Sequence, residues 1–326
     1  MEPVCIPIRH REQGGRSVTR TASEWLDRIR HIDLPERVKI MNVCGGHERS
    51  ISSAGIRGAL PDQVELIPGP GCPVCICPEE DVYEAIHIAL GEDVTLVTFG
   101  DMLRVPVNVP RREIRSLEQA KAAGADIRPI ASPIEARAIA LQNPDRDVVF
   151  FAAGFETTMA PVAAMLCEGV PDNLYVLLSG RLTWPAVAML LESGDPGFHA
   201  LIAPGHVSTV MGPEEWEFVA NDHQLPAAVS GFTSESLLAG IYSVLRQLKD
   251  GTPFLDNCYP DVVRPQGNRS ARKHLEQAFE VYNATWRGIG TIPGSGYALR
   301  EAFAGNDARA RYPGYSDESR KRVGEM

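Results

Sequence analysis

The chain has no long hydrophobic run, no excess of basic residues and no nucleotide-binding loop. Its longest apolar stretches, such as 148–154 and 174–178, fall far short of the roughly 20 residues that cross a bilayer, so no membrane span is expected. The net charge of −10 argues against non-specific binding to nucleic acid, because phosphate contacts need a basic surface. Neither a Walker-type loop nor a dinucleotide fingerprint occurs, which argues against nucleotide binding.

The cysteines are few and odd in number. Seven cysteines disfavour a purely structural disulfide framework. The amino terminus, Met-Glu-Pro-Val-Cys, has no basic region followed by an apolar stretch, so no secretory signal is expected. We therefore expect a cytoplasmic protein, in which thiols are kept reduced. The length of 326 residues allows two or three domains.

Three of the cysteines lie in two short glycine-rich turns. Cys44 belongs to Cys-Gly-Gly-His, and Cys72 and Cys75 belong to Gly-Pro-Gly-Cys-Pro-Val-Cys. Each turn follows a predicted buried strand, 38–43 or 64–67, and open α/β sheets bind ligands at the carboxyl ends of their strands. Glycine lets the backbone approach a ligand closely, and thiolates are soft metal ligands. The pattern indicates a soft-metal site or a redox-active thiol site.

Strand and helix patterns alternate along the chain, which predicts the α/β class. We expect two similar parallel-sheet domains facing a cleft, at 36–131 and 132–248. The terminal segments, 1–35 and 249–326, are expected to form a smaller third region. Within the last segment a helix is predicted at 272–283, followed by a glycine-rich stretch without a clear strand pattern.

Six motifs together resemble the HypD family of nickel-iron hydrogenase maturation factors. They occur in that family's order between about residue 20 and about residue 300. The motifs are Cys-Gly-Gly-His (44–47), Gly-Pro-Gly-Cys-Pro-Val-Cys (69–75), Phe-Gly-Asp-Met-Leu-Arg-Val-Pro (99–106), Gly-Phe-Glu-Thr-Thr (154–158), Pro-Gly-His-Val-Ser (204–208) and Trp-Arg-Gly-Ile-Gly (286–290).

The resemblance implies a scaffold that holds an iron while it acquires two cyanides and one carbonyl, the Fe(CN)2CO group. A small HypC-like chaperone is the implied partner, and a HypE-like cyanide donor is a further one. Carried over by motif, Cys44 and Cys75 would hold the iron, and Cys72 would be the redox partner of Cys75. His47 would be a ligand or a proton carrier beside them. Low-spin ferrous iron with cyanide and carbonyl ligands suits soft thiolate donors.

The sequence also departs from the family. The resemblance implies four cysteines near the carboxyl end that bind a [4Fe-4S] cluster, but no cysteine follows Cys258, so we expect the cluster to be absent. Cys77 adds a third thiol to the second turn, which makes Cys72 and Cys77 alternative metal ligands and zinc an alternative metal. These departures suggest a diverged paralogue.

Two further polar residues lie on loops after predicted strands. Glu156 and His206 are candidate cofactor-binding residues of the cleft; the alternative is that their hydrogen bonds only fix these loops. Cys44 and His47 are formally a Cys/His pair, but a scaffold is favoured over a classical enzyme. Two functions therefore stay open. One is assembly of the iron group, and the other is that of a thiol-redox or zinc-binding protein without cluster-dependent maturation activity.

Overall fold

The computed structural model describes residues 20–34 and 37–316. The chain divides into two compact units, one formed by Met1–Gly71 with Val187–Asn268 and the other by Cys72–Ala186 with Arg269–Met326. Each unit contains one sheet whose strands are mostly parallel. This confirms the predicted α/β class with two sheets. In the stretches that the structure describes, no helix is both long and apolar enough to cross a bilayer.

The sheet of the first unit is entirely parallel. β1 and β7 are neighbours in it and are almost wholly buried, as expected for parallel strands covered on both faces. The strand order is β2 (Val64–Pro68), β1 (Val38–Asn42), β7 (Ala200–Pro204), β8 (Ala227–Ser230) and β9 (Leu255–Asn257).

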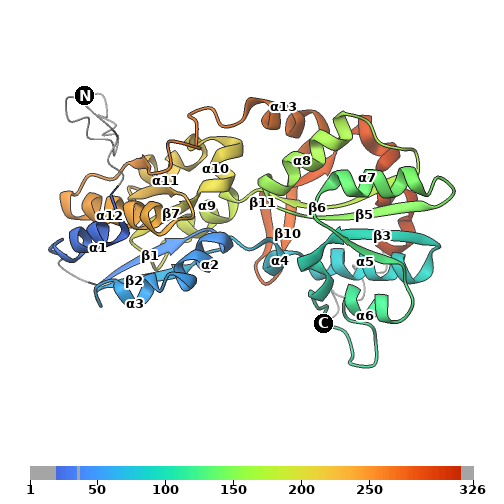
Figure 1. Cartoon of the computed structure of the whole chain (residues 1–326), viewed down its shortest axis with the longest axis horizontal. Helices are drawn as coiled ribbons and strands as arrows, with labels where there is room; N and C mark the ends of the chain where they lie inside the picture. Colours follow the sequence, from blue (N-terminus) through green and yellow to red (C-terminus); the bar gives the residue numbers. More distant parts are fainter. Residues whose placement is uncertain (1–19, 35–36, 317–326) are drawn as a thin grey trace. The chain divides into compact units, whose positions relative to one another are not determined.

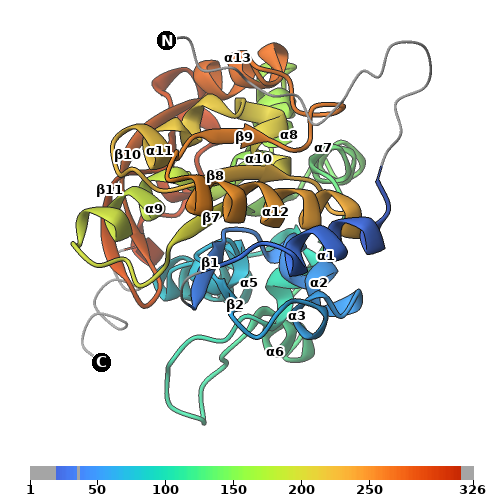
Figure 2. The ribbon, with the colours of Figure 1, turned by 90° about the vertical axis from the view of Figure 1, so that its left-hand side faces the viewer.

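Helix α1 (Ala22–Arg30) begins at a capping box. The Thr21 side chain accepts a hydrogen bond from the Glu24 N–H, and the Glu24 carboxylate accepts one from the Thr21 N–H. Figure 2 shows α1 beside α12 (Ser234–Asp250), which packs on β7 and β8. The other helices of this unit are α2 (Gly45–Ser53), α3 (Ile56–Ala59), α10 (Gly205–Met211), the 3-10 turn η2 (Glu214–Trp216) and α11 (Glu217–Asn221). Helix α9 (Trp184–Glu192) contains the division between the units.

The sheet of the second unit is mixed. The strand order is β10 (Phe279–Trp286), β11 (Gly290–Leu299), β6 (Leu174–Arg181), β5 (Asp147–Gly154), β3 (Val94–Phe99) and β4 (Ile127–Ile130). β11 runs antiparallel to both of its neighbours, β10 and β6, and the other pairs are parallel. In Figure 1, α7 (Pro133–Gln142) and α8 (Glu156–Cys167) lie on one face, and α5 (Glu79–Gly91) and α6 (Leu117–Ala122) lie on the other. The remaining elements are α4 (Pro73–Ile76), η1 (Gly100–Arg104), α13 (Arg269–Ala278), η3 (Glu301–Asn306) and α14 (Ala308–Arg311).

The carboxyl-terminal segment differs from its prediction. The helix expected at 272–283 ends at Ala278, and β10 follows it without a break. The glycine-rich stretch after it forms a hairpin, because Gly288 and Gly290 adopt positive φ at the turn and β11 then pairs with β6. The strand signal was hidden because the partner strand β6 lies more than a hundred residues earlier in the chain.

The unit boundaries also differ from the predicted ones at 131 and 248. The predicted first domain, 36–131, contains β1 and β2 of one sheet and β3 and β4 of the other. Among the described residues, each terminal segment belongs to one or both of these two units, and none forms a third unit. A local strand pattern does not reveal which strands pair, so these boundaries could not be derived from it. Residues 1–19, 35–36 and 317–326 of the predicted terminal region lie outside the described residues.

Candidate functional site

Cys44 is placed at the start of a helix in the first unit. It follows β1 and is the N-cap residue of α2, and its side chain is half-buried. Burial raises the pKa of the Cys44 thiol, while the backbone N–H groups of His47 and Gly46 act in the opposite direction. A helix N-terminus favours negative charge, so this position suits a thiolate once a metal or proton acceptor removes the thiol proton.

His47 is fully buried beneath this turn, and both its ring nitrogens have partners. Nδ1 lies 2.8 Å from Oδ1 of Asn42, and Nε2 lies 3.0 Å from the carbonyl oxygen of Ser230. The Asn42 amide donates in turn to the Glu48 carboxylate at 2.8 Å and to the Cys44 carbonyl at 3.1 Å. Burial lowers the pKa of His47 to about 4. The geometry gives His47 a positioning role and leaves neither ring nitrogen open to a metal.

The first residues of the second glycine-rich turn, up to Gly71, belong to the first unit and contact the Cys44 turn. The Gly45 N–H donates to the Gly71 carbonyl at 3.0 Å, and Gly69 donates to the Asn42 carbonyl at 2.8 Å. A Cβ on Gly71 would lie 2.5 Å from the backbone nitrogen of Cys44, so no side chain fits at this position. The second turn is thus bound to the first up to the residue that precedes Cys72.

His206 lies after β7, the neighbour of β1. Its exposed ring stacks on Phe232 with a centroid distance of 3.6 Å, and the Phe232 ring also contacts His47 at 4.6 Å. A Cβ on Gly46 would come within 2.8 Å of the same phenyl ring. Three predicted site residues, Cys44, His47 and His206, are therefore brought to the carboxyl ends of adjacent strands in one unit.

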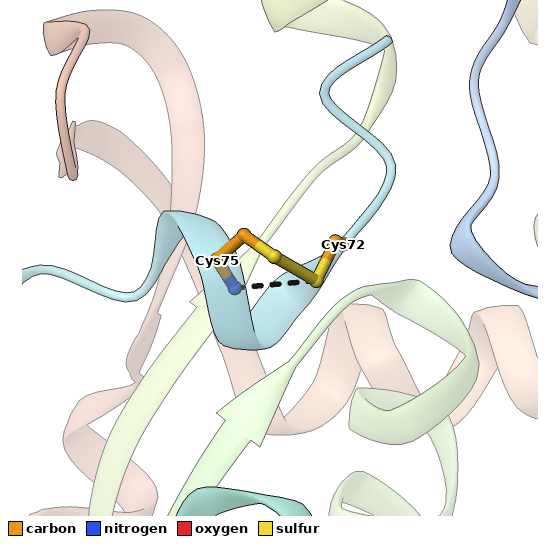
Figure 3. Close-up of a disulfide and its surroundings, with 2 residues drawn as sticks. All are labelled: Cys72 and Cys75. Atoms are coloured by element: carbon orange, nitrogen blue, oxygen red, sulfur yellow. Dashed lines mark hydrogen bonds between the residues drawn. A yellow bond between two sulfur atoms is a disulfide. The ribbon is translucent and has the colours of Figure 1, made fainter. Parts of the chain in front are cut away.

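Cys72 and Cys75 form a disulfide in the second unit (Figure 3). They span the short helix α4 with a Cα–Cα distance of 5.3 Å, and the Cys75 N–H lies 3.3 Å from Sγ of Cys72. Cys75 is exposed and Cys72 is half-buried. The exposed sulfur is therefore the one open to attack by an incoming thiol, and the capped sulfur is the better leaving group.

Cys77 faces the interior of the second unit. It is 1% exposed and lies in the hydrophobic core, with its sulfur 3.5 Å from the Ser179 hydroxyl, which donates to Asp81. Burial raises the pKa of the Cys77 thiol to about 12. This placement separates Cys77 from the exposed Cys75 and gives it the surroundings of a packed core residue.

Glu156 is the first residue of α8 and is fully buried. Its two carboxylate oxygens accept hydrogen bonds from the N–H and the hydroxyl of Thr183, at 2.6 and 2.7 Å. Burial raises the pKa of Glu156 to about 7. Glu156 thus joins the turn after β5 to the segment after β6, which corresponds to the loop-fixing alternative.

Within residues 20–34 and 37–316, no three His, Cys, Asp or Glu side chains form a group that could hold a metal ion. No sequence motif marks Asn42, Phe232 or the Ser230 carbonyl as parts of the site. A polar residue at the end of the buried strand β1 was the available signal for Asn42. Nothing local signals Phe232 or Ser230, because they reach His47 from almost 200 residues away.

Comparison with known proteins gives consistent matches. The family model HypD, described as "Hydrogenase formation hypA family", matches residues 20–324. The chain is 38% identical over 297 residues to the hydrogenase maturation factor HypD of Escherichia coli, covering 89% of this chain and 78% of that protein. Identity to HypD of Rhodobacter capsulatus is 39% over 279 residues, covering 84% and 73%. Identity to HypD of Azotobacter vinelandii is 38% over 302 residues, covering 90% and 79%.

Proposed function

The chain belongs to the HypD family of hydrogenase maturation factors, and we propose that it is the scaffold on which the iron group Fe(CN)2CO is assembled. In this proposal the iron is cargo, held by the thiolates of Cys44 and Cys75 and then passed on. Soft thiolates suit a ferrous ion that carries cyanide and carbonyl. A small HypC-like chaperone would take part in holding the iron, a HypE-like protein would donate cyanide, and the process would take place in the cytoplasm.

The observation that carries the proposal is the bond between Gly45 and Gly71. It fixes the residue before Cys72 against the residue after Cys44. Because consecutive Cα atoms are about 3.8 Å apart, the chain itself keeps Cys72 near the Cys44 turn, and Cys75 follows only three residues later. This supports convergence of the thiols from the two turns.

The disulfide makes iron binding depend on redox state. While Cys75 is bonded to Cys72, its sulfur cannot serve as a thiolate ligand. Two electrons and two protons open the disulfide and supply the ligand, and reoxidation removes it. Iron would thus be bound by the reduced scaffold and released by the oxidised one.

The other predicted residues take supporting roles in this proposal. His47 orients the Cys44 turn through Asn42 and Ser230. The exposed imidazole of His206 is available to bind the cargo or its ligands beside that turn.

The second candidate function, a thiol-redox protein, is favoured by the Cys72–Cys75 disulfide alone. Anaerobic purification with a HypC-type partner, followed by iron and zinc quantification and infrared spectroscopy in the cyanide and carbonyl region, separates the two. Iron with infrared bands that vanish in Cys44→Ala, but persist in the control Cys167→Ala, supports the scaffold. Protein without iron or bands, but with a reducible disulfide, supports the second function.

A further inference from the structure

A cavity of about 510 Å³ lies in the second unit where β3, β4 and β5 end. The next strand after β3, β4, pairs with one edge of β3, and the following strand, β5, pairs with its other edge. In open α/β sheets such a switch in strand order leaves a crevice at the carboxyl ends, where ligands bind. The cavity occupies this position, and its volume is in the range of small-molecule sites.

The disulfide turn forms part of the cavity wall. Pro73 and Val74, the two residues between the bonded cysteines, both line it. Cys75 is covalently next to Val74 and is exposed to solvent. A molecule held in this cavity therefore lies beside a disulfide whose outer sulfur is accessible.

The polar groups of the lining are of two kinds. Asp101, after β3, provides an exposed carboxylate, and Thr157 and Thr158, in the first turn of α8, provide hydroxyls. Within the part of the chain that the structure describes, these three side chains have no hydrogen-bond partner. A carboxylate attracts an ammonium group, whereas hydroxyls donate to a carboxylate. Apolar lining by Phe99, Ile130 and Pro161 completes the cavity.

We propose that this cavity binds a low-molecular-weight thiol carrying both an ammonium and a carboxylate group, and that this thiol reduces the Cys72–Cys75 disulfide. The inference rests on the proposed function, in which Cys75 must become free to hold iron. A small peptide thiol fits the size of the cavity and its mixed polar lining.

The chemistry is two successive thiol–disulfide exchanges. The bound thiolate attacks the exposed Cys75 sulfur, a mixed disulfide forms, and the Cys72 sulfur leaves and takes up a proton. The Cys75 N–H, 3.3 Å from Sγ of Cys72, stabilises that leaving thiolate. A second thiol attacks the mixed disulfide and releases Cys75. In sum, two thiols and the protein disulfide give one small-molecule disulfide and two protein thiols.

The test compares two reductants on the oxidised full-length chain: glutathione, which carries the required charges, and 2-mercaptoethanol, which carries none. Free thiols at Cys72 and Cys75 are counted by mass after rapid alkylation. We expect the glutathione rate to saturate with concentration and the 2-mercaptoethanol rate to rise linearly. Asp101→Asn and Thr157→Val should each slow reduction by glutathione about threefold to fivefold, the effect of one exposed polar contact, with no change for 2-mercaptoethanol. Asp172→Asn, an exposed change outside the cavity, should alter neither rate.

A linear glutathione dependence, or equal rates for the variants and the parent chain, would overturn the proposal. The proposal would also be overturned if a protein dithiol reduced the disulfide faster than glutathione does, at a rate that neither Asp101→Asn nor Thr157→Val changes. The reductant would then be a protein. Reduction with a phosphine separates this inference from the proposed function. If infrared bands are obtained after phosphine treatment but the variants are reduced by glutathione as fast as the parent, only the thiol-binding role of the cavity is rejected and the scaffold function stands. Absence of iron even after phosphine treatment rejects the scaffold.

Discussion

The backbone N–H of Gly45 donates a hydrogen bond to the carbonyl of Gly71 across 3.0 Å. Gly45 follows Cys44 and Gly71 precedes Cys72, and both glycines belong to the first unit, so this bond holds the start of the second cysteine turn against the first turn. Gly71 permits this approach because it carries no side chain; a Cβ there would lie 2.5 Å from the backbone nitrogen of Cys44. Cys44 and the residue before Cys72 are thereby held in one local structure, and the predictions below start from it.

Gly71→Ala should separate the two turns. The new methyl group would meet the backbone of Val43 and Cys44 at 2.5 Å, and backbone cannot rotate away as a flexible side chain can. We expect a loss of about 1–3 kcal/mol in the free energy of unfolding, the usual cost of overpacking, together with loss of bound iron. Urea unfolding and metal analysis measure the two effects.

Gly58→Ala is the matched control, because it adds the same methyl group in α3 with no atom within 4 Å. It should keep both stability and iron. Equal iron content in the Gly71 and Gly58 variants would contradict the importance of the close approach.

His47→Ala should destabilise the Cys44 turn. The neutral His47 ring carries one N–H and donates to either the Asn42 or the Ser230 oxygen, so the variant leaves one buried acceptor without its donor, which costs about 1–3 kcal/mol. Alkylation of Cys44 by iodoacetamide should become faster because the turn opens more often. His206→Ala, in which an exposed ring is lost, should leave the melting temperature nearly unchanged. A His47 variant with unchanged stability would remove the positioning role.

The depressed pKa of His47 also predicts a pH dependence. The ordinary value is 6.5 and the folded value is about 4, so the unfolded chain binds a proton more readily than the folded chain between these limits. The contribution of His47 to stability is complete above pH 6.5 and is lost as the pH falls toward 4. Denaturant titrations of the parent chain and His47→Gln should show this extra slope only in the parent.

Glu156 predicts the opposite sign. Burial raises its pKa from 4.5 to about 7, so the folded chain holds the proton more tightly than the unfolded chain. Its contribution to stability is complete below pH 4.5 and is lost as the pH rises through 7. Glu156→Gln keeps the shape without the titration and should flatten this part of the stability profile. Identical profiles for the two proteins would show that folding does not change the pKa of Glu156.

Cys77→Ala tests whether the third thiol of the second turn binds metal. Because Cys77 is 1% exposed and packs in the core, we expect a loss of about 1 kcal/mol from the small cavity and no change in iron content. Cys75→Ala, in contrast, should lose most of the iron. Compared with the parent in the reduced state, in which neither chain has the Cys72–Cys75 disulfide, it should show little change in stability, since the Cys75 side chain is exposed. Iron loss in the Cys77 variant at unchanged stability would restore it as a ligand.

Local chemistry made much of the fold predictable. The alternating strand and helix patterns predicted the α/β class, and the strands predicted at 38–43 and 64–67 are β1 and β2. The glycine-rich turns after β1 and β2 also occupy the carboxyl ends of their strands, as parallel sheets require. These features depend on residues close together in sequence, which is why a pattern predicts them.

Long-range partners were beyond such patterns. The strand β11 exists because it pairs with β6, and His47 is fixed by the Ser230 carbonyl, 183 residues away. The sequence likewise did not reveal that Cys77 turns inward while Cys75 stays exposed, because that difference depends on how α4 meets the core. The two thiols are the same residue type and differ only in how deeply the folded chain buries them.

The central claim is that one iron is held by thiolates from both turns. Iron K-edge X-ray absorption on the reduced, anaerobically loaded chain counts the sulfur atoms around the metal. The account predicts two sulfur neighbours for each iron in the parent chain, and one for the residual iron that either Cys44→Ala or Cys75→Ala retains. Iron surrounded only by nitrogen and oxygen, or a sulfur count unchanged in both variants, would contradict it.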